Sequence, residues 1–192
     1  MSRRKNLRRS DWLRDTLGRS RKEAVASAVM SSACDNYLGA FAVALRASLA
    51  QMGWLTAAPQ LFGAVCQLLS VWLCTRFNRR RTIVTGVILQ SLSVFGMAAI
   101  AVVRPPGAVL ALIGLAVVYQ GAANFVQPQW RGWMGSIVPP RRRGAYFAGR
   151  TQLTMITSLA VFAGGGTLLG FFDRVDAALY GFALLFAVAG FG

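Results

Sequence analysis

The sequence predicts an all-α protein, a polytopic membrane helix bundle of about six transmembrane helices, and two observations lead to this prediction. Hydrophobic residues make up 55% of the 192 residues, and charged residues only 14%. The charges gather in clusters, and the apolar runs between them reach about twenty residues, enough to cross ~30 Å of hydrocarbon as a helix. A soluble basic domain would instead spread polar residues along its helix faces, so the net charge of +15 does not indicate nucleic-acid binding.

The apolar runs place the expected elements along the chain. Residues 1–23 form a basic tail, for which a short amphipathic helix on the membrane surface and a disordered segment are both open. The transmembrane bundle takes up residues 24–192. Its last run is short for a crossing and the chain ends while still apolar, so we expect a fragment of a longer protein. The six expected spans are residues 24–47, 52–75, 82–103, 108–128, 151–172 and 177–192, the last of them truncated.

The positions of lysine and arginine predict how these spans are oriented. With six spans the loops alternate between the two sides of the membrane. Of the 21 basic residues, Arg46, Arg104 and Arg174 fall on one side and all the others fall on the opposite side. Basic residues favour the cytoplasmic side, so we expect the N-terminus and the arginine-rich loops in the cytoplasm. The sequence RPPG at Arg104–Gly107 must end a helix, because proline lacks the N–H that a helix needs.

The sequence has no histidine, which removes most of the chemistry of enzymes and zinc sites. We therefore expect no enzyme activity, no metal and no cofactor. The three cysteines, Cys34, Cys66 and Cys74, are interpreted as small apolar residues within the spans. Cys66 and Cys74 lie eight residues apart on one expected helix, about 12 Å along its axis, which is too far for a disulfide.

Asp35 is the only acidic residue within an expected span. A charge at the centre of a bilayer is costly, so this carboxylate should face the bundle interior or a watery cavity. Ser27, Ser31 and Asp35 are spaced four apart and share one helix face, and Asn36 adjoins them. Two interpretations are open: a site for a proton, cation or substrate, and a structural carboxylate hydrogen-bonded between helices.

Polar stripes also mark the second and fourth spans. In the fourth, Gln120, Asn124, Gln127 and Arg131 follow one another at spacings of four, three and four, while the other faces are apolar. In the second, Gln60 stands in a stripe of polar and small residues. Such stripes either hold helices together or line a path through the membrane. The candidate substrate- or ion-binding residues are Asp35, Asn36, Gln60, Gln120, Asn124 and Gln127.

The loop after the second span, LCTRFNRRRTIV at residues 73–84, resembles the signature loop between the second and third helices of the major facilitator superfamily. Arg76 takes the first basic position of that signature, and Arg79, Arg80 and Arg81 take the later ones. The resemblance implies a cytoplasmic gate built on this loop. Thr75 stands where the family has an aspartate that helps to close the gate, so a gate here must use another acid or a hydrogen bond.

The stretch PQWRGWMGSIVPPRRRGAYFAGR, residues 128–150, resembles the connection between the fourth and fifth helices in a bacterial branch of that superfamily. Pro139 and Pro140 should end the fourth helix. Gly144 should allow a sharp turn or a close approach, and Arg143 should cap helix carbonyls or meet lipid phosphate. A plain loop whose arginines only set orientation is the alternative. The expected gate and anchor residues are Arg76, Arg79, Arg80, Arg81, Arg143 and Gly144.

The resemblance covers residue 24 to the end of the chain. It implies the N-terminal six-helix half of a twelve-helix secondary transporter in a bacterial plasma (inner) membrane, with spans one to three related to spans four to six as an inverted repeat. The implied partners are a small-molecule substrate, a coupling proton or cation, the lipid bilayer and a C-terminal six-helix half. Drug/proton antiport is not indicated, because Val117 stands where that motif has arginine. The alternatives are a non-transporting membrane scaffold or receptor and a membrane-embedded enzyme.

Overall fold

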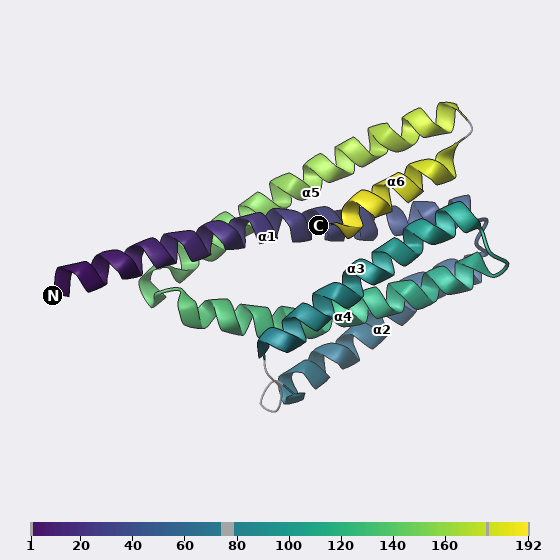
Figure 1. Ribbon diagram of the computed structural model, residues 1–192. Helices are drawn as coiled ribbons and strands as arrows, with labels where there is room; N and C mark the ends of the chain where they lie inside the picture. Colours follow the sequence, from purple (N-terminus) through teal and green to yellow (C-terminus); the bar gives the residue numbers. More distant parts are fainter. Residues whose placement is uncertain (1, 74–78, 176, 192) are drawn as a thin grey trace.

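The computed structural model describes residues 2–73, 79–175 and 177–191, and every regular element in them is a helix, which confirms the predicted fold class (Figure 1). Successive α-helices run in opposite directions along the bundle (Figure 1). The elements are α1 (Ser2–Ala44), α2 (Leu49–Leu73), α3 (Arg79–Val103), α4 (Ala108–Ile137), the 3-10 turn η1 (Pro140–Arg142), α5 (Arg143–Arg174) and α6 (Ala178–Gly190).

Among the described residues, four helices are long and apolar enough to cross a membrane: Leu49–Trp72, Arg80–Val103, Ala108–Ile137 and Arg143–Arg174. The helix α6 has the same apolar character but only 13 residues. In α1 the apolar part is interrupted by adjacent Asp35 and Asn36, which lower its hydropathy. Within the described residues, each predicted segment thus has a helix along most of its length, and the two that depart from a regular span are the first and the last.

Several helices extend beyond the predicted spans. The helix α1 runs without a break from Ser2, so residues 2–23 continue the helix of the first span, and the 43 residues reach about 65 Å at 1.5 Å each. Residues 2–23 contain no proline and are rich in arginine, lysine and leucine, which favour helix. The helix α5 likewise begins at Arg143, before the predicted start at residue 151.

The two ends of the bundle differ. We call the end where α3 begins and where residues 138–142 connect α4 to α5 the arginine-rich end, and the opposite end, with residues 45–48 and 104–107, the far end. At the far end Ser48 and Gln51 form a capping box that starts α2: the Ser48 N–H donates to Gln51 Oε1 over 2.8 Å, and the Gln51 N–H to Ser48 Oγ over 3.3 Å. As predicted, α3 stops directly before RPPG.

The helices pack as two groups of three (Figure 1). The helix α4 packs against α2 and α3, α1 packs against α5 and α6, and contacts between α3 and α6 join the groups. The two groups correspond helix by helix, α1 to α4, α2 to α5 and α3 to α6. Under this correspondence the contact between α1 and α5 matches that between α4 and α2, and the contact between α1 and α6 matches that between α4 and α3. The packing thus follows the inverted repeat expected from the resemblance.

The buried core lies in the half of the bundle nearest the far end. At its centre is Phe41 of α1, whose ring centroid is 5.2 Å from that of Phe182 and 5.3 Å from that of Phe186. Met97 of α3 and Leu112 of α4 complete it, both fully buried. The helices α2 and α5 instead leave large apolar side chains exposed, as expected of helices whose outer faces meet lipid.

Candidate functional site

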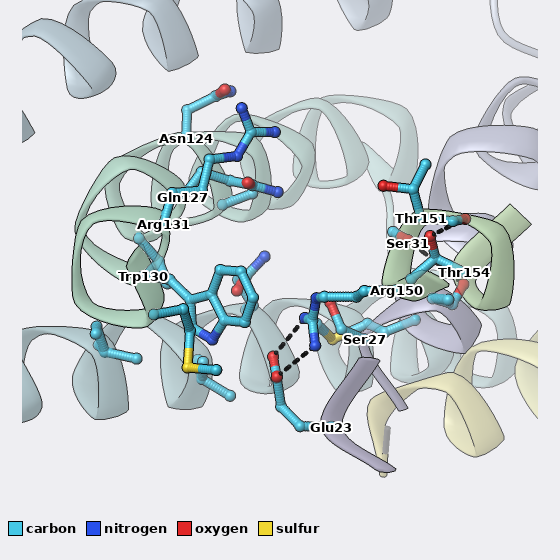
Figure 2. A pocket seen from close by; sticks show the side chains of 18 of the residues that line it. Glu23, Ser27, Ser31, Asn124, Gln127, Trp130, Arg131, Arg150, Thr151 and Thr154 are labelled. Carbon is cyan, nitrogen blue, oxygen red and sulfur yellow. Dashed lines mark hydrogen bonds and ion pairs between the residues drawn. The ribbon is translucent and has the colours of Figure 1, made fainter. Parts of the chain in front are cut away.

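A cavity of about 1540 Å³ occupies the other half of the bundle, toward the arginine-rich end (Figure 2). Its lining comes from α1 (residues 20–35), α3 (residues 83–90), α4 (residues 119–134) and α5 (residues 147–158). The helices α1 and α5 form one wall, and α4 forms the opposite wall. The core closes the bundle toward the far end, so the cavity is a space between the two groups of helices on the arginine-rich side.

The polar stripe of α4 lies along its wall of the cavity. Gln120, Asn124, Gln127 and Arg131 all line the space, because spacings of three and four keep them on one helix face. The side-chain amide of Asn124 donates to the backbone carbonyl of Gln120 over 3.0 Å. Within the part of the chain that the structure describes, Gln127 and Arg131 have no protein partner, so their polar groups are available to a solute or water.

Asp35 lines the same cavity from α1, together with Ser27 and Ser31 one and two turns away. The residue is exposed to the space rather than packed between helices. Among the described residues, its carboxylate has no hydrogen-bond donor and no basic partner. Of the two acids among the described residues of the lining, Glu23 and Asp35, Asp35 lies further along α1 toward the core.

Two of the predicted site residues lie elsewhere. The Asn36 amide turns back on its own helix and donates to Ser32, over 2.8 Å to the carbonyl and 3.0 Å to Oγ. Gln60 lies exposed on α2, which does not contribute to the cavity lining. The small and polar stripe of α2 holds helices together instead, since Ser70 Oγ donates to the Phe125 carbonyl over 2.6 Å and accepts from Gln129 Nε2 over 3.2 Å.

The predicted gate residues have different surroundings. Arg76 lies outside the described residues, as does the side chain of Arg79. Arg80 and Arg81 are exposed in the first turn of α3. The Nε of Arg143 donates to the Val138 carbonyl over 3.0 Å, so it caps the carbonyl end of α4 as predicted.

The expectation for Gly144 is wrong. It lies inside α5 with a helical backbone, and a Cβ placed on it would meet nothing within 4 Å. The turn comes earlier, where Val138 is extended (φ −78°, ψ 126°) and Pro139 leads into η1. The prolines, as predicted, end α4 and set the change of direction, and so no glycine is required there.

The sequence reasoning missed a cluster at the arginine-rich end of the cavity. Arg150 of α5 forms an ion pair with Glu23 of α1, at 3.0 Å, and its guanidinium lies 4.0 Å from the ring centroid of Trp130 on α4 (Figure 2). The sequence marks Arg150 and Trp130 only as part of the stretch at residues 128–150 that resembles the superfamily, and Glu23 only as part of the basic tail. A signal existed, because Glu23 continues the face of Ser27, Ser31 and Asp35 one turn further.

A bundle of lipid-length helices around a polar cavity is a polytopic membrane protein able to admit a small polar solute or ion. The chain belongs to the Major Facilitator Superfamily, whose family model matches residues 24–192. Membership implies a secondary transporter with a solute substrate, and transporters of this kind are generally not enzymes. No curated protein and no solved structure matches the chain.

Proposed function

We propose that the chain is the cavity-bearing bundle of a secondary active transporter that moves a small polar solute by alternating access, with Asp35 as its substrate- or ion-binding group. The observation that carries this proposal is the Asp35 carboxylate, which faces the cavity without a basic partner among the described residues. A carboxylate that only held two helices together would have a donor from the neighbouring helix.

The chemistry of the lining favours a solute or ion that brings a positive charge or a proton. Asp35 can bind a cation, or take and release a proton that couples to transport. Gln120, Asn124 and Gln127 on the opposite wall offer amide donors and acceptors, which would orient the solute. Asn36 and Gln60 were candidates as well, but Asn36 donates to its own helix at Ser32 and Gln60 lies outside the cavity.

The arginine-rich end is proposed to face the cytoplasm of a bacterial plasma membrane, in accordance with the distribution of basic residues. Arg80, Arg81 and Arg143 would then lie beside anionic lipid head groups, and Arg76 and Arg79 would belong to the same surface. Transport would require a second six-helix bundle across the cavity, as the resemblance implies, because alternating access works by rocking one bundle against another.

The experiment is solute-driven proton movement in proteoliposomes that hold the whole transporter and the dye pyranine. Small amines, sugars and amino acids are added one at a time, and Asp35→Asn is compared with the parent protein. The matched control is Asp173→Asn, an exposed acid at the far end of α5. We expect at least one solute to drive proton movement in the parent and the control, and Asp35→Asn to reduce it at least tenfold, about 1.4 kcal/mol of lost interaction.

Equal proton movement in Asp35→Asn and the parent would refute the role of Asp35. Binding of a solute by the parent without any flux of that solute would support the alternative, a non-transporting receptor or scaffold with the same fold. Binding can be followed separately by the rise in melting temperature of the purified protein.

A further inference from the structure

We propose that Arg150 is a positioning residue that holds the two walls of the cavity together at the arginine-rich end and thereby controls access to Asp35. We call Arg150, with Glu23, Ser20 and Trp130, the Arg150 latch. The transport consequence rests on the proposed function, but the closure itself can be measured without any substrate.

The contacts to α1 fix the guanidinium in place. Its Nη1 lies 3.0 Å from Glu23 Oε2 and its Nη2 donates to Glu23 Oε1 over 3.2 Å, so the ion pair is bidentate. Nη1 also donates to the Ser20 carbonyl over 2.6 Å and lies 3.2 Å from Ser20 Oγ. A bidentate pair between arginine and a carboxylate is among the stronger side-chain contacts, and its geometry is specific.

The contact to α4 crosses the cavity. Arg150 belongs to the α1–α5 wall, and its guanidinium lies over the ring of Trp130 on the opposite wall, 4.0 Å from the centroid (Figure 2). A cation over the face of tryptophan is attracted by the negative face of the ring, more strongly where water is excluded. One side chain therefore links α5, α1 and α4 on the arginine-rich side of the cavity, away from the core that joins the two groups of helices.

The burial of the partners indicates which part can open. The Arg150 side chain is 13% exposed, whereas that of Glu23 is 49% exposed. The arginine is thus held among protein groups, while the glutamate reaches it from the solvent edge. A second contact between α5 and α1 lies beside the ion pair, since the Tyr146 hydroxyl lies 2.6 Å from Ser20 Oγ. Loss of the ion pair should let the end of α1 move away from α5 and Trp130.

Arginine is required for this arrangement. A lysine at position 150 could satisfy Glu23 as a point charge, but it lacks the planar fork that binds both carboxylate oxygens and lies flat on Trp130. The residues between Glu23 and Asp35 on α1, Ser27 and Ser31, line the route from the open end to the carboxylate. A solute moving along that route passes the latch before it reaches Asp35.

The test measures how fast a membrane-impermeant thiol reagent labels a cysteine placed inside the cavity, Gln127→Cys. The whole protein is used in nanodiscs, with Cys34, Cys66 and Cys74 replaced by alanine. Glu23→Arg and Arg150→Glu each bring like charges together, and the double variant restores an opposite pair. The matched control is Arg141→Glu, the same change of charge at an exposed residue of η1 that lies away from the cavity.

We expect the cysteine at position 127 to be labelled about tenfold faster in each single variant than in the parent, because the loss of one charge-assisted pair favours the open arrangement by about that factor. The control should label at the parent rate. The double variant should label more slowly than either single variant, though faster than the parent, because glutamate cannot stack on Trp130. Such a rescue depends on the pair and not on a general loosening of the bundle.

Two results would overturn the proposal: equal labelling in the parent and Glu23→Arg, or no rescue in the double variant. If Arg150→Glu fails to fold, Glu23→Arg remains decisive, since its side chain is half exposed and tolerates replacement. Labelling needs no transported solute. An outcome in which the latch variants behave as expected while Asp35→Asn keeps full proton movement would reject the proposed role of Asp35 and leave the latch intact.

Discussion

Replacing Gly165 by alanine should destabilise the bundle, because Tyr37 of α1 packs directly on this glycine of α5. A Cβ at position 165 would lie 2.8 Å from Cε2, Cζ and the hydroxyl oxygen of the tyrosine ring. The ring cannot move aside freely, since its hydroxyl donates to the Phe162 carbonyl. The new methyl group would therefore push the two helices apart and break this hydrogen bond.

The size of the effect follows from these two costs. Overpacking in a well-packed site costs about 1–3 kcal/mol. Loss of the tyrosine hydrogen bond would add about 1 kcal/mol. The gain in helix propensity from glycine to alanine returns up to about 1 kcal/mol. We therefore expect Gly165→Ala to lower the free energy of unfolding by about 1–3 kcal/mol.

The neighbouring glycine provides a matched control. A Cβ at Gly164 would meet nothing within 4 Å, so Gly164→Ala should be neutral or stabilising by up to about 1 kcal/mol. The assay is unfolding of the purified protein in bicelles, followed by intrinsic tryptophan fluorescence. If Gly165→Ala proves as stable as Gly164→Ala, the close α1–α5 contact is not as described. A combined Gly165→Ala and Tyr37→Leu variant should recover much of the loss, since it removes the ring that the new methyl group meets.

Two further predictions concern the core and the α2–α4 contact. Phe41→Ala should cost about 3–5 kcal/mol in the same unfolding assay, because the ring is fully buried between Phe182 and Phe186; a loss below about 1 kcal/mol would contradict that packing. Ser70→Ala should cost about 1–3 kcal/mol, because the buried amide of Gln129 loses its partner, and a Ser70→Ala variant as stable as the parent would show that water or another group replaces the hydroxyl.

The sequence was sufficient for the parts of the fold that depend on local chemistry. Apolar runs of membrane length located the helices, and the prolines at 105–106 and 139–140 located two of their ends. Where the reasoning depended on glycine alone it failed, since Gly144 turned out to be an ordinary helical residue. Charge composition likewise did not show that residues 2–23 continue the first helix, because basic residues are compatible with helix and with a solvated tail.

The candidate site was predictable where it depends on spacing along a single helix. Spacings of three and four placed Gln120, Asn124 and Gln127 on one face, and Asp35 was marked by the cost of a charge in lipid. Which way a polar face turns is decided by the packing of neighbouring helices, so Gln60 could not be assigned from its own helix. The pair of Glu23 with Arg150 joins residues 127 apart in sequence, and only the folded bundle brings them together.

The central claim is that the cavity opens to the same side of the membrane as the arginine-rich connections, and cysteine labelling tests it directly. An impermeant thiol reagent is applied to sealed inside-out vesicles that contain Ala145→Cys, Gln127→Cys or Gly107→Cys in a background without native cysteines. We expect labelling at positions 145 and 127 and none at 107, with position 107 reacting only in right-side-out vesicles. Labelling of position 107 together with 145, or of 127 only from the side that labels 107, would contradict the orientation and the cavity described here.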